Sequence, residues 1–217
     1  VHDGMRRMFA VQEDVFYYIT AMNENYTHPA MPKGAEQGII KGLYQFSKGG
    51  KKKKKVQLIG SGAILREVIA AAELLDKDWG VDADIWSATS FTELAREARD
   101  CDRWNRLHPN EEARVPYVTQ CLEGCQGPII AATDYIQLYA DEIRTWIPAR
   151  YEVLGTDGFG RSDTRAQLRK HFEVNSYYVV VAALKALADE GVLPATKVAE
   201  AIAKYGIDPE KPNPLHA

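Results

Sequence analysis

Short apolar segments alternate four times with longer helical segments from Val56 onward, and this alternation restricts the chain to few folds. Strands are predicted at residues 56–59, 83–88, 128–132 and 151–154, and a helical pattern follows each of them. Short, almost wholly apolar strands joined by helical crossovers are typical of a parallel sheet that is buried on both faces. We therefore predict an α/β domain with helices on both faces of a mainly parallel sheet.

The first three predicted helices show local start and end signals. Residues 63–79 repeat apolar side chains at spacings of three and four, and Gly80 ends the pattern. A second helix is predicted at residues 92–107, and a third begins after a cap at Thr133 or Asp134. The inner face of this third helix is predicted to hold Ile136, Tyr139, Ile143 and Ile147.

Three further helices are predicted near the C-terminus. Thr164 and Gln167 have the spacing of a capping box, and Asn175 can cap a helix at residues 176–190. Residues 177–181 are rich in β-branched side chains, so propensity alone also allows a strand there. The preceding cap and the length of the segment favour a buried helix. A last helix is predicted at residues 195–205.

The N-terminal part of the chain is less regular. Residues 5–12 read as the end of a helix, and residues 15–20 as a strand rich in aromatic and β-branched side chains. Residues 23–34 contain two prolines and no periodicity, which predicts an irregular connector. Residues 37–46 fit either a strand or a short helix. The chain begins without methionine, and its first strand has no local partner, so we expect a fragment of a longer protein.

A lysine run, SKGGKKKKK, occupies residues 47–55. Glycine and lysine here predict a flexible turn. A solvated loop tip is favoured over a contact site for an acidic partner.

Composition excludes several classes of protein. The chain has 217 residues, 46% of them hydrophobic, which is enough for one substantial core. A net charge of -3 and a pI near 6.0 argue against a nucleic-acid binder. No apolar run is long enough to span a bilayer, and no signal peptide opens the chain, so we expect no membrane association and a cytoplasmic protein. Three cysteines, an odd number, fit a reducing compartment.

The loop after the fourth predicted strand is the main candidate for a site. It contains Asp157, Arg161 and Asp163 around Gly158 and Gly160. Loops at the carboxyl ends of strands are where α/β domains meet ligands and partners, and glycines permit close backbone approach. These charged residues are predicted ligand or interface contacts. Pairing within the loop or with a neighbouring domain is favoured over direct contact with a ligand.

The residues show no evident catalytic, cofactor-binding or metal-binding constellation. Gly60-Ser61-Gly62 lies between a strand and a helix, but Leu65 replaces the third glycine of a dinucleotide fingerprint, and no acidic residue ends the next strand. His108 and His171 have no serine or cysteine nucleophile in a recognisable setting, which favours structural roles. Cys121 and Cys125 lack the further ligands of a zinc site. We therefore predict no catalytic, cofactor or metal residue in this chain.

Five segments together resemble the C-terminal part of the homodimeric bacterial pyruvate dehydrogenase first components, which are transketolase-like, thiamine diphosphate-dependent, decarboxylating enzymes. These segments are YYITAMNENYTHPAMPKGAEQGI, GSGAILREV, TSFTELAREARDCDRWN, LGTDGFGRSDTR and HFEVNSYYVVVAAL. The similarity covers nearly the whole chain, including the tail DPEKPNPLHA.

The resemblance implies a specific architecture. Residues 1–34 would complete a preceding pyrimidine-binding domain and a connector. Residues 35–217 would form a transketolase-like C-terminal domain, a three-layer α/β fold with a mixed five-stranded sheet.

It also implies a function. The family decarboxylates pyruvate oxidatively on thiamine diphosphate with Mg²⁺ and transfers acetyl to a lipoyl group of the acyltransferase core. The nearest matches to its magnesium motif, Thr156-Asp157-Gly158 and His2-Asp3-Gly4, lack the downstream asparagine. The expected role is therefore a non-catalytic structural and dimerisation domain that binds no cofactor and is inactive alone, with a second subunit and the acyltransferase core as partners.

Two alternatives remain open. The chain could be a binding module that docks the acyltransferase core. It could also be a free-standing oxidoreductase that uses residues 60–62.

Overall fold

The computed structural model describes residues 1–216, and the chain forms two compact units, the first ending at Ala30 and the second beginning at Met31. The first unit contains α1 (His2–Met5) and η1 (Arg6–Ala10), followed by a segment without helix or strand. The helix predicted to end near residue 12 is confirmed. The irregular connector at residues 23–34 is also confirmed.

The strand predicted at residues 15–20 is wrong. Among residues 1–216 no strand pairs with this segment, and the side chains of Phe16 and Tyr18 are 85% and 87% exposed. Tyr17 packs instead on the first helix, where its hydroxyl donates to Asp3 Oδ2 at 2.9 Å and accepts from Arg7 Nη1 at 2.8 Å. Side-chain contacts therefore replaced the strand pairing that β-propensity favoured.

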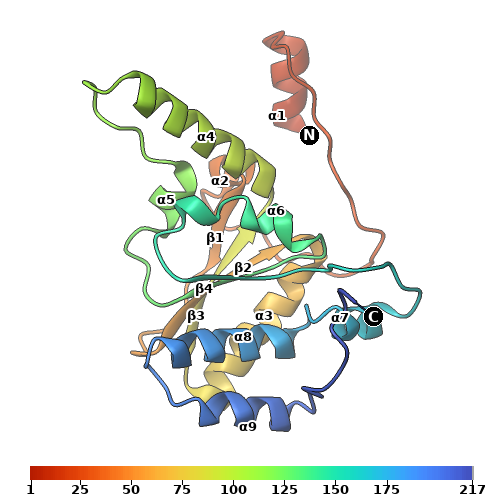
Figure 1. Cartoon of the computed structure of the whole chain (residues 1–217). Coiled ribbons are helices and arrows are strands. Elements are labelled where there is room, and N and C mark those ends of the chain that lie inside the picture. The colour runs from red at the N-terminus through yellow and green to blue at the C-terminus, as the bar shows by residue number, and fades with distance from the viewer. Residues whose placement is uncertain (217) are drawn as a thin grey trace. The chain divides into compact units, whose positions relative to one another are not determined.

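The second unit is built on a five-stranded mixed sheet in the order β1-β3-β2-β4-β5 (Figure 1). The strands are β1 (Leu43–Ser47), β2 (Lys55–Ser61), β3 (Asp82–Ala88), β4 (Ile129–Ala132) and β5 (Tyr151–Leu154). Strands β2 to β5 pair in parallel, and β1 pairs antiparallel with β3 at one edge. The predicted mainly parallel sheet is confirmed.

The segment at residues 37–46, which the sequence left open between helix and strand, contains both. Helix α2 (Glu36–Lys41) ends at Gly42, whose φ of 104° lies in the left-handed region, and β1 follows directly. A side chain on Gly42 would also meet the backbone oxygen of Ser90 at 2.6 Å. The glycine thus allows a helix to turn sharply into an edge strand.

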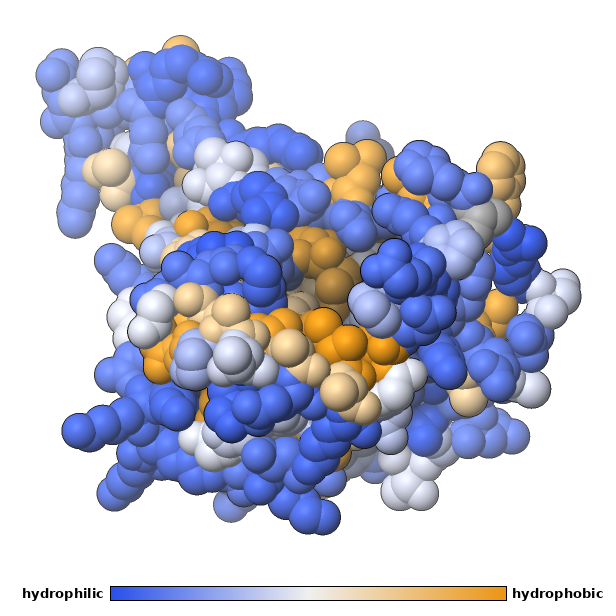
Figure 2. Space-filling model, turned by 60° about the horizontal axis from the view of Figure 1, so that its bottom comes forward, coloured by the Kyte–Doolittle hydropathy of each residue, from blue (hydrophilic) through white to orange (hydrophobic). Residues whose placement is uncertain are grey.

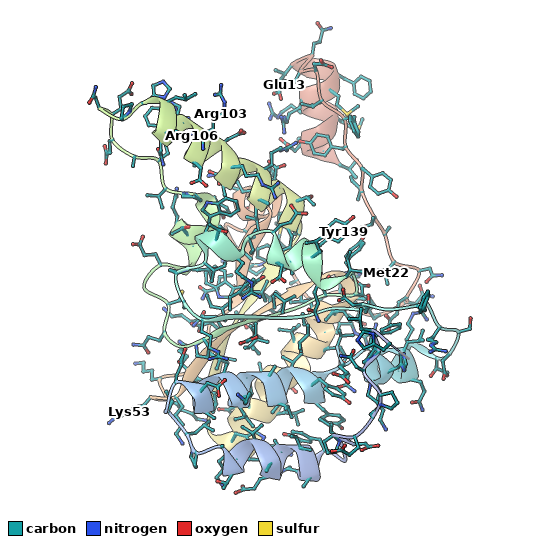
Figure 3. All side chains as sticks on the ribbon, viewed as in Figure 1. Glu13, Met22, Lys53, Arg103, Arg106 and Tyr139 are labelled. Atoms are coloured by element: carbon teal, nitrogen blue, oxygen red, sulfur yellow. The ribbon has the colours of Figure 1, made fainter. Side chains whose placement is uncertain are left out.

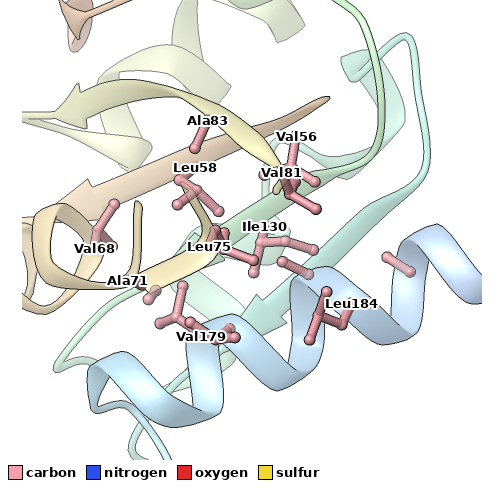
Figure 4. Close-up of a cluster of buried hydrophobic side chains, with 14 of the residues drawn as sticks. Val56, Leu58, Val68, Ala71, Leu75, Val81, Ala83, Ile130, Val179 and Leu184 are labelled. Carbon is pink, nitrogen blue, oxygen red and sulfur yellow. The ribbon is translucent and has the colours of Figure 1, made fainter. Parts of the chain in front are cut away.

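One face of the sheet is covered by η2 (Gly62–Ile64), α3 (Leu65–Leu74), η3 (Leu75–Trp79), α8 (Ser176–Asp189) and α9 (Thr196–Lys204). Helix α8 packs on α3 and β4, and α9 packs on α8 (Figure 1). The core of this layer, part of which Figure 4 shows, includes Val56, Leu58, Val68, Leu75, Ile130, Val179 and Leu184.

The opposite face is covered by α4 (Phe91–Leu107), α5 (Tyr117–Leu122) and α6 (Gln137–Asp141). Its core includes Ile59, Trp86, Leu94, Val118, Ile129, Ile143 and Val153. Neighbours such as Leu58 and Ile59 belong to different clusters because successive strand side chains point to opposite faces. The predicted three-layer arrangement is therefore confirmed.

The predicted helix caps are formed. Thr164 Oγ1 accepts from Gln167 N at 3.4 Å at the start of α7 (Arg165–His171). Asn175 Oδ1 accepts from the amides of Tyr177 and Tyr178 at 3.1 and 3.2 Å, and residues 177–181 are helical. These side chains satisfy amides that the first helical turn leaves unpaired.

The third predicted helix is wrong in detail. It is short, because α6 spans only Gln137–Asp141 and is followed by η4 (Arg144–Trp146). Its N-cap is Ile136, not Thr133 or Asp134. The predicted inner face holds for Ile143, which is buried, whereas Ile136 and Tyr139 are each 42% exposed. Helix α5 was not predicted at all.

The lysine-rich loop between β1 and β2 is held by buried carboxylates. Gly49 N donates to Asp84 Oδ1 at 2.7 Å, and Lys52 N donates to Asp82 Oδ2 at 2.6 Å. Both aspartates lie on β3 and are about 5% exposed or less. The predicted turn is present, but its backbone is anchored to the sheet.

Candidate functional site

The candidate site lies at the carboxyl edge of the sheet, where the loop after β5 meets the start of α6. Thr156 N donates to Tyr135 O at 2.8 Å, and Thr156 Oγ1 donates to Asp134 O at 2.7 Å. Asp157 Oδ2 accepts from Gln137 N, the first amide of α6, at 2.9 Å. The loop after β5 therefore fixes the segment that follows β4.

Gly158 allows the C-terminal tail to lie directly against this loop. Its φ is +107°, and a Cβ at this position would lie 2.2 Å from the backbone oxygen of Pro214. No other residue type fits such a contact without displacing the tail. Pro214 itself is buried. The glycine-rich character of the loop is thus explained by a close approach of the chain's own backbone.

A pocket of about 290 Å³ lies between the loop and the tail. It is lined by Gln137, Leu154, Gly155, Asp157, Phe172, Glu173, Asn213, Pro214 and Leu215. Its polar side chains are amides and carboxylates, which can form hydrogen bonds and ion pairs, and its lining contains no serine, threonine, cysteine, lysine or histidine side chain.

Glu173 is held in an unusual conformation at this pocket. Its φ of 63° is left-handed, which is uncommon for a residue with a side chain. Its carboxylate pairs with Lys211 Nζ at 2.9 Å, and the same ammonium donates to His171 O at 2.8 Å. These contacts fasten the tail to the end of α7. The buried His171 Nε2 has no hydrogen-bond partner among the described residues.

The three predicted contact residues are not brought together. Asp157 lines the pocket, whereas Arg161 and Asp163 are exposed on the loop. Asp163 Oδ1 accepts from the next amide, Thr164 N, at 2.6 Å. Arg161 makes no hydrogen bond or ion pair within residues 1–216. Of these charges, Asp157 therefore has a local structural task and Arg161 is available to a partner.

The other residues that the sequence suggested as candidates, Gly60, Ser61 and His108, make contacts within the fold. A Cβ on Gly60 would lie 2.7 Å from Leu65 Cα, so this glycine allows α3 to pack closely on β2. The hydroxyl of Ser61 donates to Thr133 Oγ1 at 2.8 Å in the buried sheet edge. The ring of His108 stacks on Trp104 with centroids 4.4 Å apart. These contacts support the structural alternative for each.

Cys101 lies on α4, Cys121 on α5 and Cys125 in the loop after α5, and all three cysteines are free. Burial raises the pKa of the Cys121 and Cys125 thiols, which keeps them protonated. No cluster of three or more His, Cys, Asp or Glu side chains suited to a metal ion is found in the described part of the chain. In the same residues, no helix is both long and apolar enough to cross a membrane.

Sequence reasoning missed Gln137, Glu173 and Asn213 as parts of this pocket. Asn213 caps its own turn, where its Oδ1 accepts from Leu215 N at 2.9 Å. The Asn-Pro pair at residues 213–214 is a turn signal, but nothing local links it to a loop about fifty residues upstream.

Comparison with known proteins gives two family matches. Residues 42–175 match the sequence model of the transketolase-like TK C-terminal domain. Residues 1–29 match that of the pyruvate dehydrogenase E1 component middle domain.

Curated relatives match along almost the whole chain. The pyruvate dehydrogenase E1 component of Cupriavidus necator is 60% identical over 217 residues, which are 99% of this chain and 24% of the relative. That of Pseudomonas aeruginosa is 58% identical over 99% of this chain and 25% of the relative. That of Escherichia coli K12 is 57% identical over 99% of this chain and 24% of the relative. The chain thus spans about a quarter of the length of these relatives.

Among solved structures, transketolase from Leishmania mexicana aligns with a TM-score of 0.46 at 17% identity. The alignment covers 69% of this chain and 18% of the transketolase.

Proposed function

Because this chain belongs to the transketolase-like C-terminal domain family and corresponds to the C-terminal part of bacterial pyruvate dehydrogenase E1 components, we propose that it is the non-catalytic, structural and dimerisation domain of such an enzyme. The observation that carries this proposal is the alignment with an E1 component at 60% identity, which covers 99% of this chain but only 24% of the length of that relative. Residues 1–34 are proposed to end the preceding domain, and residues 35–217 to form the C-terminal domain.

The whole enzyme is proposed to decarboxylate pyruvate oxidatively and to pass acetyl to the lipoyl group of an acyltransferase. That reaction needs thiamine diphosphate and Mg²⁺, which supply the carbanion chemistry when bound. The Thr156-Asp157-Gly158 string does not fit a magnesium site, and no cluster of three or more metal-ligating side chains is found among residues 1–216. Asp157 is engaged by Gln137 N, and Gly158 is covered by Pro214, so the Thr156-Asp157-Gly158 string does not present converging oxygen ligands. No catalytic step is therefore assigned to residues of this chain.

An exposed apolar surface on α6 supports an interface role. Leu138 is 65% exposed, and Tyr139, labelled in Figure 3, projects from the same short helix. The rings of Tyr135 and Tyr139 lie 5.4 Å apart, and both side chains are more than 40% exposed. Large exposed apolar side chains gathered in this way mark sites of contact with other protein surfaces.

The proposal is tested by turnover and by complementation. The 217-residue chain, incubated with pyruvate, thiamine diphosphate and Mg²⁺, is expected to release no carbon dioxide. A truncated E1 lacking this portion is expected to lose activity and to regain some when the chain is added. Carbon dioxide release by the chain alone, at a rate comparable with intact E1, would refute the proposal.

The interface role is tested separately in full-length E1. Leu138→Glu places a charge on the apolar surface and is expected to shift sedimentation from dimer towards monomer. Leu107→Glu, at another exposed leucine at the end of α4, serves as the matched control. Equal dimerisation of both variants would exclude the α6 surface from the subunit interface.

A second candidate function is a binding module that docks the acyltransferase core. The observation favouring it is Phe159, 77% exposed at the tip of the loop after β5. Calorimetric titration of the chain with the acyltransferase's E1-binding segment separates the two functions. The structural domain predicts no heat of binding, whereas the module predicts saturable binding that Phe159→Ala abolishes.

A further inference from the structure

A second pocket, of about 470 Å³, lies on the unit that begins at Met31, at the edge of the sheet where β2 and β3 begin. It is formed by the lysine-rich loop, the end of η3, α8 and α9. Its apolar lining consists of Trp79, Leu184, Leu193 and Pro194. Its charged lining consists of Lys54, Asp78, Lys197, Glu200 and Lys204.

The charges of this lining favour an anionic ligand. Lys197 Nζ pairs with Glu200 at 2.6 Å, and Lys204 Nζ pairs with Asp78 at 3.0 Å. Lys204 holds the pKa of the Asp78 carboxyl below its usual range, so this pair is ionised at neutral pH. Lys54 makes no ion pair within residues 1–216, and the pocket therefore carries one uncompensated positive charge.

The neighbouring loop adds further free cations. Lys52 pairs with Asp76, and Lys55 Nζ pairs with Asp84 Oδ1 at 2.9 Å, so these two lysines serve the fold. Lys51, Lys53 and Lys54 are exposed and make no ion pair in the described part of the chain. Figure 3 shows Lys53 extending away from the ribbon. The five-lysine run thus contains two lysines paired with carboxylates of the same chain and three exposed lysines without an ion pair among the described residues.

The outward lysines are presented on a fixed backbone. Besides the bonds from Gly49 and Lys52 to the aspartates of β3, Asp82 N donates to Lys54 O at 3.0 Å. A loop that is already ordered loses little conformational freedom when it binds a ligand. The loop tip is solvent-exposed, as the sequence predicted, and its backbone is hydrogen-bonded to the sheet.

The floor of the pocket suits an apolar side chain. Trp79 Nε1 donates to the hydroxyl of Tyr205 at 2.8 Å, and that hydroxyl donates to Asp78 Oδ2 at 3.0 Å. The polar edge of the indole is therefore satisfied, which leaves its ring for apolar contact. On the face brought forward in Figure 2, hydrophobic residues form a band bordered by hydrophilic ones.

The unpaired ammonium of Lys54 lies beside the apolar floor, and Lys51 and Lys53 add unpaired charges on the adjoining loop. From this arrangement we propose that the pocket is a docking site for an acidic segment of a partner protein that carries an apolar side chain. A small inorganic anion has no use for the apolar floor. A nucleic acid is disfavoured because the chain has 30 acidic against 27 basic residues, without the basic excess of nucleic-acid binders. An acidic peptide with a leucine matches both parts of the pocket, with carboxylates on the lysines and the leucine over Trp79.

The test measures binding of a fluorescein-labelled peptide, Glu-Glu-Leu-Glu-Glu, to the full chain by anisotropy at low salt. The variant Lys53→Ala/Lys54→Ala removes two free cations and leaves the anchoring lysines intact. The matched control is Arg103→Ala/Arg106→Ala, which removes two exposed cations of α4 that are labelled in Figure 3. Thermal unfolding confirms that both variants are folded.

The lysine variant is expected to weaken binding by roughly fivefold, and the arginine control by less than about twofold. Replacing the peptide's leucine by serine is expected to weaken binding to the unmodified chain. Absence of peptide binding, equal losses in both variants, or equal binding of the serine peptide would each overturn the proposal. Tighter binding of a single-stranded oligonucleotide than of the acidic peptide would overturn it as well.

Discussion

Gly158 and Pro214 are in direct backbone contact, so that a Cβ on the glycine would lie 2.2 Å from the proline oxygen. Gly158→Ala is expected to destabilise the fold by about 1–3 kcal/mol, because the new methyl group meets both a strained φ and the tail. The measurement is the urea unfolding midpoint, with carboxypeptidase digestion reporting release of the tail. Gly160→Ala is the control, since a Cβ there would have no atom within 4 Å. Equal midpoints for both variants would contradict the contact.

Asp84 joins the sheet to the lysine-rich loop. It is 5% exposed and accepts from Gly49 N, Lys55 Nζ and Gln57 Nε2. Asp84→Ala is expected to cost about 3–5 kcal/mol, because it leaves the mostly buried Lys55 ammonium without its counter-charge.

The control for Asp84→Ala is Asp76→Ala, which removes an exposed ion pair with Lys52 and is expected to cost less than about 1 kcal/mol. Guanidinium unfolding compares the two variants. A cost for Asp84→Ala no larger than that of the control would show that the buried pair is not an anchor.

The cap of α8 depends on one side chain. Asn175→Ala is expected to lower the free energy of unfolding by about 1 kcal/mol, because two amides lose their acceptor. Asn175→Asp keeps an acceptor at the same place and is expected to stay within a few tenths of a kcal/mol of the parent. Thermal unfolding distinguishes them. If alanine and aspartate behave alike, the cap does not stabilise the helix.

The buried thiol of Cys101 is expected to make the stability of the fold depend on pH in the alkaline range. Burial, together with its hydrogen bond to Glu97, raises the pKa of this thiol to about 11 from the ordinary value of 9.0. The thiol ionises at a lower pH in the unfolded chain than in the folded one. The free energy of unfolding therefore keeps its full contribution from Cys101 below pH 9 and falls as the pH rises from 9 towards about 11.

The measurement is the guanidinium midpoint of the parent and of Cys101→Ala at pH 8 and pH 10.5. The alanine variant is expected to lose less stability between these two values, since it lacks the titrating group. Identical losses would exclude Cys101 as a source of the dependence.

Arg161 was predicted to be a contact residue, and its side chain makes no hydrogen bond or ion pair within residues 1–216. In full-length E1, Arg161→Ala is expected to weaken subunit assembly by about 1–3 kcal/mol, the range for a hydrogen bond to a charged group. Sedimentation at several concentrations measures it, and Arg106→Ala, an exposed arginine of α4, is the control. The isolated chain is expected to unfold identically with and without the change. Unaltered assembly of full-length Arg161→Ala would remove this residue from any interface.

Local sequence determined the strands of the parallel sheet and most of the helix ends, but not the start and length of α6 or the presence of α5. The strands of the parallel sheet, the caps at Thr164 and Asn175 and the stop at Gly80 follow from signals within a few residues, because a helix end must satisfy its own amides and carbonyls nearby. The same signals failed at residues 15–20, where β-propensity was present but no strand among residues 1–216 pairs with the segment.

Only the tertiary structure decided which loops meet. Three contacts join segments that are far apart in the chain. Gly158 lies against Pro214, and the left-handed Glu173 pairs with Lys211. Asp82 and Asp84 anchor the lysine-rich loop. The exposure of Leu138 and Tyr139 on α6 belongs with them, since an apolar side chain in the sequence does not say whether it is buried or exposed. Such contacts depend on how finished elements pack together, and no short window of sequence contains that information.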